Sequence, residues 1–321
     1  MAPDARSPAQ KEPVIGLALG SGSARGWAHI GVIEELEALG VRPQIVAGTS
    51  IGALVGAVYV SGQLKEFSEW VRQLTARDVF GLLDIKFAGG MVKGEKLFGL
   101  FMEQHKNPKI EGLDQKFISI ATEMLTGREI WITHGPILSA ARASCAMPGL
   151  FSPVQHDERW MLDGGLVNPV PVSAARAAGA QLIIAVNLNV QLIGTHLSRT
   201  SRQQVESDAA TATAEEKTIW QKVAEYFSAA EGEPPSFFDV IASSVNIMQD
   251  RITRSRMAGD PPEITLVPLL PDFALMDFHR AAEAIEEGRR LVQRNANDIL
   301  TRIGRDPSIA AAEVGKGTAG I

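Results

Sequence analysis

The sequence predicts an α/β protein with a central, mostly parallel sheet flanked by helices. Short apolar runs at 14–19, 45–47 and 182–187 have the length and composition of strands buried on both faces of such a sheet. A helical pattern at 27–39 lies between the first two runs and ends at Gly40, so these segments form a βαβ unit with a right-handed crossover. With 321 residues, the chain can bury a substantial core as one large domain or as one domain with an appendage.

The second strand leads into the most informative stretch of the chain, IVAGTSIG at 45–52. A helix-forming run rich in small residues follows at 53–61, so the pattern is strand, sharp turn and helix, which is typical of a nucleophile elbow with Ser50 at its apex. Gly48 and Gly52 supply the small neighbours that the strained backbone of such a serine requires. The helix would direct its N-terminal amides at negative charge developing on the serine. A tight turn with an N-capping serine is the alternative interpretation.

A second loop, rich in glycine, follows the first strand at 20–26. Because neighbouring parallel strands end at one edge of a sheet, this loop is expected beside the elbow, where open α/β folds bind their ligands. The amides of Gly22 and Ser23 are free to turn inward. Together with the amide of Ile51, they would bind the oxyanion of a tetrahedral intermediate.

The glycine loop also permits a different interpretation. Gly20, Gly22 and Gly26 after a first strand resemble a dinucleotide-binding loop. That fold places an acidic residue at the end of the second strand, where this chain has GTS at 48–50, so the dinucleotide interpretation loses its second support. Arg25 is expected to hold the loop's shape by hydrogen-bonding carbonyl groups, with a surface charge at the helix start as the alternative.

A third motif, DGG at 163–165, follows a predicted short strand at 160–162. A tight turn is one interpretation, because such turns are common. In the other, Gly164 and Gly165 let a second backbone segment approach, so that the carboxylate of Asp163 meets Ser50. An exposed aspartate is a weak base, so burial would have to raise the proton affinity of this one.

Composition divides the chain into five ranges. Residues 1–12 are polar and predict a disordered arm, and 13–190 carry the three motifs and form the expected catalytic core. The range 191–235 is rich in Ser, Thr, Gln and Glu and predicts a mobile insertion or linker. Residues 236–304 are expected to complete the same domain with helices and a strand, and 305–321 to form a disordered tail.

Hydrophobic spacing predicts the remaining elements. These are strands at 116–124, 129–132 and 263–267, and helices at 53–73 (broken near Gly62), 95–104, 137–146, 237–256 and 277–303. The helix at 237–256 has an apolar stripe that predicts a core-facing side: Phe238, Ile241, Val245, Met248 and Ile252. The apolar run 79–87 has no clear period and is interpreted as core or as a lid or lipid-facing wall of the site.

Bulk properties exclude several classes of protein. A net charge of −6 argues against nucleic-acid binding and against strong electrostatic attraction to an anionic membrane. The amino terminus has no apolar signal sequence and the chain has no run of 18 apolar residues, so we expect a cytoplasmic protein without a transmembrane helix.

The single cysteine and the six scattered histidines predict no disulfide, no metal site and no cofactor. Cys145 is expected to pack in the core and not to act as a nucleophile, because no base is placed for it. His156 is the histidine closest in sequence to Asp163. It lies in a polar segment, HDER at 156–159, and is predicted to be solvated.

Four sequence blocks, in this order along the chain, are similar to those of the bacterial patatin-like phospholipases. They are GSGSARG at 20–26, GTSIG at 48–52, ASCAMP at 143–148 (continuing to Phe151 and Pro153) and DGG at 163–165. The likeness covers about residues 14–190. It implies the family's three-layer α/β fold and hydrolysis of lipid acyl esters, of the lipase, phospholipase A or lysophospholipase type. Members of the family often have three consecutive glycines in the first loop, whereas this chain alternates glycine and serine.

The resemblance also implies residue roles. Ser50 matches the nucleophile and Asp163 the base of a Ser/Asp dyad that works through an acyl-enzyme, and the oxyanion hole maps to Gly22, Ser23 and Ile51. The motif residues that support this arrangement are Gly20, Arg25, Gly26, Gly48, Gly52, Gly164 and Gly165. The implied partner is a lipid or acyl-ester substrate, reached through peripheral membrane contact, and the oligomeric state stays open.

Two other functions compete with an acyl hydrolase. One is a nucleotide-binding regulatory protein that uses the loop at 20–26 for phosphate. The other is a catalytically silent family member that acts as an interaction partner.

Overall fold

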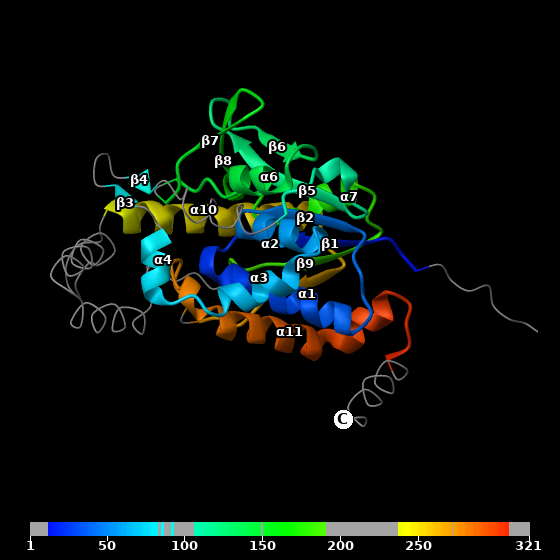
Figure 1. Ribbon diagram of the computed structural model, residues 1–321. Helices are drawn as coiled ribbons and strands as arrows, with labels where there is room; N and C mark the ends of the chain where they lie inside the picture. Colours follow the sequence, from blue (N-terminus) through cyan, green and yellow to red (C-terminus); the bar gives the residue numbers. More distant parts are fainter. Residues whose placement is uncertain are drawn as a thin grey trace, which may run out of the picture.

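A central sheet of eight strands organises the computed structural model, which describes residues 12–82, 85–86, 91–92, 106–148, 150–190, 237–271 and 273–307. Its strands are β1 (Ile15–Leu19), β2 (Ile45–Thr49), β5 (Lys116–Glu123), β6 (Glu129–Ile132), β7 (Val154–His156), β8 (Arg159–Asp163), β9 (Leu182–Val186) and β10 (Ile264–Leu266). The order is β10-β9-β1-β2-β5-β8-β7, with β6 paired to β5 off this path. Strands β10, β9, β1, β2 and β5 run parallel, whereas the pairs involving β6, β7 and β8 are antiparallel. The predicted α/β class with a mostly parallel central sheet is therefore confirmed (Figure 1).

Helices lie on both faces of the sheet. They are α1 (Ala28–Ala38), α2 (Ile51–Val60), α3 (Leu64–Val71), α4 (Ala76–Leu82), α6 (Ile137–Ser144), α7 (Val172–Ala177), α10 (Phe237–Gly259) and α11 (Ala281–Arg302). Short 3₁₀ helices are η1 (Ser23–Trp27), η2 (Ile110–Gly112), η3 (Gly164–Leu166) and η4 (Phe278–Arg280), and a separate small sheet pairs β3 (Ile85–Lys86) with β4 (Met91–Val92). None of the helices within the described ranges is long and apolar enough to cross a membrane.

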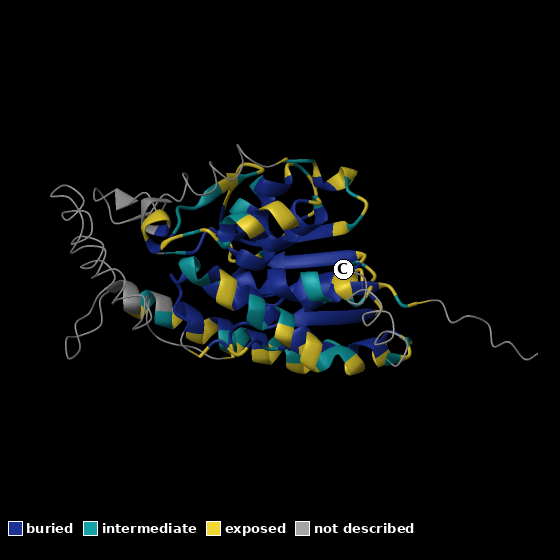
Figure 2. Cartoon of the chain, turned by 60° about the horizontal axis from the view of Figure 1, so that its bottom comes forward, coloured by how far each residue is buried: buried dark blue, intermediate teal, exposed yellow. Residues whose placement is uncertain are grey.

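Successive residues of the strands enter two separate hydrophobic cores. Leu17 and Val46 pack in the core that also contains residues of α1, α2 and α11. Ala18 and Ala47 face the other way, toward α7, and their small side chains let this helix lie close to the sheet. The buried strands between two helical layers, whose outer sides are exposed, are visible in Figure 2. Three layers result, with the carboxyl ends of β1 and β2 at one edge.

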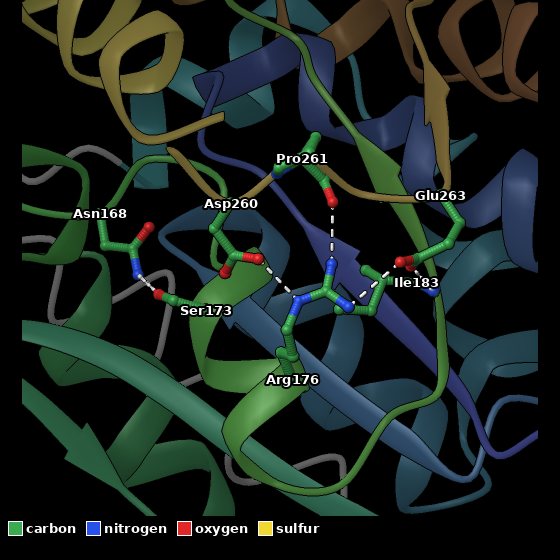
Figure 3. Close-up of polar contacts among 7 residues, drawn as sticks. All are labelled: Asn168, Ser173, Arg176, Ile183, Asp260, Pro261 and Glu263. Atoms are coloured by element: carbon green, nitrogen blue, oxygen red, sulfur yellow. Dashed lines mark hydrogen bonds and ion pairs between the residues drawn. The ribbon is translucent and has the colours of Figure 1, made fainter. Parts of the chain in front are cut away.

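Arg176 connects α7 to the segment that precedes the edge strand β10. Its guanidinium donates to Asp260 Oδ1 over 2.6 Å, to the carbonyl of Pro261 over 2.8 Å and to Glu263 Oε1 over 3.1 Å (Figure 3). The second carboxylate oxygen of Glu263 accepts the amide of Ile183 in β9 over 2.7 Å. This cluster fixes where the chain leaves α10 and enters β10.

Most elements predicted from hydrophobic spacing are present near the predicted bounds. The helix at 53–73 is divided into α2 and α3 at Gly62, whose φ of +71° ends the first of them. The antiparallel pair of β5 and β6 and the strand β10 are also confirmed. The helix at 95–104, the insertion at 191–235 and most of both termini lie outside the described residues. At the inner ends of those termini, Glu12 and Arg305 form an ion pair with an Nε–Oε1 distance of 2.7 Å.

Candidate active site

Two strands bring the predicted reactive side chains to neighbouring positions of a third strand. β2 pairs in parallel with β5, and its last residue, Thr49, lies opposite Ile120. β8 pairs antiparallel with β5, and its last residue, Asp163, lies opposite Ala121. Because β6 occupies the other edge of β5 at both positions, β2 and β8 share one edge and their carboxyl ends meet. Ser50, which follows Thr49, is thereby placed beside Asp163.

Ser50 and Asp163 are joined by a short hydrogen bond. Ser50 Oγ donates to Asp163 Oδ2 over 2.6 Å, and the amide of Gly165 donates to Asp163 Oδ1 over 2.7 Å. Burial raises the pKa of the Asp163 carboxyl to about 6, although the hydrogen bonds from Ser50 and Gly165 oppose this increase by favouring the charged form. The carboxylate is thus a stronger base than an exposed aspartate, yet it stays mostly ionised at neutral pH.

Ser50 occupies a strained turn between β2 and α2. Its φ of 56° and ψ of −126° are rare for a residue with a side chain. A Cβ at Gly48 would lie 2.6 Å from the backbone N and Cα of Ala53, and a Cβ at Gly52 would strike the carbonyl group of Leu19. The two glycines are therefore required because β2, α2 and β1 approach one another through their backbones.

The segment at 143–148 holds both members of the pair in place. The amide of Ser50 donates to Ser144 Oγ over 2.7 Å, and the amide of Asp163 donates to the carbonyl of Ala146 over 2.9 Å. From the sheet, Thr122 Oγ1 donates to the carbonyl of Asp163 over 2.8 Å. Backbone groups next to each reactive side chain are thus fixed by neighbours on α6 and β5.

The glycine loop packs tightly against its surroundings. Added Cβ atoms would strike Leu188 from Gly22 and Ile51 from Gly26, and the other motif glycines are in similar close contact: Gly20, Gly164 and Gly165. Arg25 is buried, and its Nε lies 3.4 Å from the carbonyl of Gly22, to which it donates. Burial lowers the pKa of Arg25 to about 10, so the group stays charged. Arg25 is therefore an internal support of the loop and not a surface charge.

Three backbone amides near Ser50 are free to bind an anion. Gly22, Ser23 and Ile51 line the same pocket as Ser50. Ser23 and Ile51 begin η1 and α2, so their amides lack partners within these helices. Across the described ranges of the chain, no group accepts a hydrogen bond from any of the three amides. The positive end of the α2 dipole adds to the attraction for a negative charge at this point.

The pocket that contains Ser50 is largely apolar. Trp27 forms edge-to-face contacts with Phe67 and Phe278 at centroid distances of 5.6 and 5.7 Å. Its other apolar lining residues are Ile51, Leu54, Trp70, Leu74, Val79, Cys145, Met147, Leu150, Phe151 and Leu275. Val79 shows that the ambiguous run at 79–87 contributes to the wall of the site. None of the described lining residues carries a charged side chain.

Comparison with known proteins identifies the family. Residues 17–176 match the model for patatin-like phospholipase. NTE family protein Rv1063c of Mycobacterium tuberculosis (strain ATCC 25618 / H37Rv) is 32% identical over 324 residues, which cover 87% of this chain and 90% of that protein. The chain belongs to the patatin-like phospholipase/NTE family. Membership supports lipid acyl hydrolysis as the class of activity.

Other similarities of this patatin-like chain are partial. Patatin-like phospholipase domain-containing protein 6 of Mus musculus is 30% identical over 185 residues, which are 55% of this chain and 14% of that protein. The crystal structure of VipD from Legionella pneumophila aligns with a TM-score of 0.43 and 13% identity, over 90% of this chain and 77% of that one.

α10 lies beyond the residues matched by the patatin-like model and closes one side of the pocket. Its residues Asn246 and Gln249, called here the α10 wall, line the pocket together with Ser50. Ser21 Oγ donates to Gln249 Oε1 over 3.1 Å and accepts from Asn189 Nδ2 over 3.1 Å. The α10 wall is thereby attached to the glycine loop, a link that the sequence analysis did not identify.

The predicted apolar stripe on α10 is wrong in part. Val245 is buried, but Met248 is 48% exposed, and the side chain of Phe238 lies outside the described residues. The polar residues Asn246 and Gln249 are instead only 3% exposed. These two polar positions therefore line the pocket, where Gln249 accepts a hydrogen bond from Ser21 of the glycine loop.

A series of hydrogen bonds outside the pocket supports the turn at Ser50. Thr49 Oγ1 donates to the carbonyl of Asn168 over 2.8 Å, and Asn168 Nδ2 donates to Glu129 Oε1 over 2.7 Å. Asn168 Nδ2 also donates to Ser173 Oγ over 3.2 Å (Figure 3). Glu129 Oε2 accepts from Arg256 Nη2 of α10 over 2.6 Å. The residue before Ser50 is thus connected through β6 to the far end of α10.

The remaining candidate side chains have clear positions. Burial raises the pKa of the Cys145 thiol well above its ordinary value, which agrees with the packing role predicted for it. His29 is fully buried, its Nε2 lies 2.8 Å from the carbonyl oxygen of Gly20, and burial lowers its pKa to about 4. The predicted solvation of His156 is wrong, because its side chain is only 15% exposed at the end of β7.

One group of side chains has the composition of a metal site. His134, His156 and Asp157 each place one donor atom within 4.8 Å of the others. His134 lies between β6 and α6, whereas His156 and Asp157 lie in the β7–β8 hairpin, and the fold brings the three together.

Proposed function

We propose that the protein is a serine acyl-ester hydrolase in which Ser50 is the nucleophile and Asp163 its base. The observation that carries this proposal is the 2.6 Å hydrogen bond from Ser50 Oγ to Asp163 Oδ2 beside an apolar pocket. The strained backbone at Ser50 exposes the hydroxyl at the turn between strand and helix, as nucleophile elbows do.

In the first half-reaction, Ser50 Oγ attacks the carbonyl carbon of the ester while its proton passes to Asp163 Oδ2. The resulting oxyanion is stabilised by the amides of Gly22, Ser23 and Ile51. When the C–O bond to the alcohol breaks, Asp163 returns the proton to the departing alkoxide, which leaves an acyl-enzyme. In the second half-reaction, Asp163 takes a proton from water as the water attacks the acyl group, and Ser50 regains its proton.

The lining of the pocket supports a lipid-derived acyl group as substrate. Aromatic and aliphatic side chains supply the apolar contact that an acyl chain requires. A nucleotide carries charged phosphates and a polar sugar, whereas most of the described lining is apolar and none of it is charged. We therefore favour an acyl hydrolase over a nucleotide-binding protein. A substrate held in a bilayer would be reached by contact with the membrane surface.

Replacement of Ser50 tests the proposal. Ser50→Ala should reduce hydrolysis of a chromogenic medium-chain ester by at least about 10³-fold, because the nucleophile is removed. Ser244→Ala, at an exposed position of α10, is the matched control and should keep the parent rate. A fluorophosphonate probe should label the parent protein and not the Ser50→Ala variant. Parent-like hydrolysis by Ser50→Ala would exclude this function, and an unlabelled, inactive parent would favour a catalytically silent protein.

A further inference from the structure

Asn246 is a largely buried polar side chain that lines the pocket of Ser50. It is 3% exposed. In the described part of the chain, no hydrogen bond to the side-chain amide of Asn246 is present, and its atoms are not among the sealed polar atoms that lack a partner, so the amide reaches the open space of the pocket. Gln249, one turn further along the same face of α10, accepts a hydrogen bond from Ser21. Gln249 therefore supports the protein's own structure, whereas the amide of Asn246 is available to a molecule in the pocket.

An amide group that opens into a pocket can both donate to and accept from a bound molecule. Because Asn246 makes no hydrogen bond within the described part of the chain, its hydrogen-bonding groups are available to a ligand that occupies the pocket.

The other polar lining groups indicate what kind of ligand this is. They are all uncharged and lie on the glycine loop, the elbow and α10: Ser21, Ser23, Ser50 and Gln249. A carboxamide both donates and accepts, which suits a hydroxyl group better than a phosphate or an ammonium group. Because Gln249 links α10 to the glycine loop, Asn246 belongs to the polar end of the pocket, where the ester must lie, and the aromatic residues form the remainder.

We propose that Asn246 binds a hydroxyl group on the alcohol part of a neutral acyl ester, of the acylglycerol class. This inference rests on the proposed function, since it assumes that the ester is cleaved at Ser50. Asn246 is then a specificity-determining residue. It selects esters of hydroxylated alcohols over simple alkyl esters of the same acyl chain.

A matched pair of substrates tests this assignment. A 1-monoacylglycerol and the propyl ester of the same fatty acid have equally long alcohol parts and differ in the two hydroxyl groups. Asn246→Leu should lower kcat/KM for the monoacylglycerol on the order of 10-fold. The value of kcat/KM for the propyl ester should stay the same. The melting temperature of Asn246→Leu should stay close to that of the parent, because the amide makes no hydrogen bond within the described part of the chain. Ser244→Ala again serves as the control.

The outcomes are distinguishable. Equal losses on the two substrates, or no loss on either, would overturn the role of Asn246. A fall in melting temperature with both activities reduced would show that Asn246 is structural, which also overturns it. Failure of the proposed function would be seen separately, as hydrolysis that survives in Ser50→Ala. Binding to inactive Ser50→Ala, measured by thermal shift with the two esters, should show a preference for the monoacylglycerol that the Ser50→Ala/Asn246→Leu variant lacks.

An independent observation carries a second inference, at the cluster of His134, His156 and Asp157. Asp157 Oδ2 lies 3.5 Å from His134 Nε2 and 3.6 Å from His156 Nε2. Ligand atoms about 2.0–2.1 Å from a tetrahedral ion are separated by about 3.3–3.4 Å, so these three atoms need only a small adjustment to share one ion. His134 precedes α6, whereas His156 and Asp157 belong to the β7–β8 hairpin. We infer that they form a site for a divalent ion of the zinc class, with water as the fourth ligand.

Isothermal titration with Zn²⁺ tests this site in the full chain. One ion per chain should bind the parent, and the double variant His134→Ala/His156→Ala should lose that binding. Glu158→Ala, at the neighbouring position of the hairpin turn, should keep it. Co²⁺ in place of Zn²⁺ should give the visible absorption of a four-coordinate ion. Lack of saturable binding by the parent, or equal binding by the double variant, would overturn the inference.

Discussion

Two parts of the pocket are built by different means. The floor of the pocket, consisting of the elbow at Ser50, the glycine loop and Asp163, is fixed by backbone hydrogen bonds and by glycines pressed against other main-chain segments. The α10 wall is formed by two polar side chains of one helix. Of these two, Gln249 is hydrogen-bonded to the floor, through Ser21 of the glycine loop. The floor lies within the residues that match the patatin-like family, and the α10 wall lies outside them. On the proposed function, the floor would carry the chemistry and the wall would determine which ester is accepted.

The largest effect is expected from removing the base in the floor. Asp163→Asn keeps the shape of the side chain, but an amide cannot take the proton of Ser50. We expect kcat/KM for a chromogenic ester to fall by about 10²–10⁴-fold. Burial of a charge destabilises the fold, so the variant should be at least as stable as the parent at pH 8, where Asp163 is ionised. Comparable activity of parent and variant would remove Asp163 from the mechanism. The activity should be expressed per folded enzyme, which the unfolding curve of each variant gives, so that a loss of stability is not mistaken for a loss of catalysis.

The next effect concerns the main-chain contacts of the floor. A Cβ at Gly52 would strike the carbonyl of Leu19, which is backbone and cannot rotate away. Gly52→Ala should therefore lower the free energy of unfolding by about 1–3 kcal/mol or more, measured by urea denaturation. Gly112→Ala is the control, because no atom lies within 4 Å of its Cβ position, and it should change stability by less than about 0.5 kcal/mol. Equal effects of the two substitutions would contradict the close approach of α2 and β1.

A smaller effect, reversible in the parent protein, is expected from pH. Burial raises the pKa of Asp163 to about 6, and only the ionised carboxylate accepts the proton of Ser50. The value of kcat/KM should thus be level above pH 7 and fall about tenfold per pH unit below about 6. Stability has the opposite trend for this group. Its pKa is higher in the folded state than the ordinary value of 3.8, so its contribution improves as the pH falls from 6 toward 4. Activity that stays level down to pH 5 would exclude Asp163 as the base.

The same comparison explains what the sequence could predict. Ser50, Asp163 and their glycines were identifiable, because close backbone contacts allow few residue types and leave a recognisable pattern. The meeting of β2 and β8 on one edge of β5 was not readable from spacing, since it depends on strand pairing between distant segments. The sequence analysis treated α10 as a core helix, because apolar spacing was assumed to mark its buried side. His134 and His156 appeared scattered for a similar reason, because they come from different segments that lie close together in the fold.

The smallest effect on stability is expected from a substitution on the exposed side of α10, which faces away from the pocket. Ile247 is 57% exposed, whereas Val245, two positions before it, is 5% exposed and counts among the buried hydrophobic residues. Ile247→Ser should change the free energy of unfolding by no more than about 0.5 kcal/mol, because little apolar surface leaves a buried environment. Val245→Ser should cost about 2 kcal/mol or more, through the loss of buried apolar contact and the burial of a hydroxyl group. Urea denaturation of both variants, at two protein concentrations, makes the comparison. A large and concentration-dependent loss in Ile247→Ser would show that this side of α10 packs against a second copy of the chain, and the wall would then depend on assembly as well as on its own side chains.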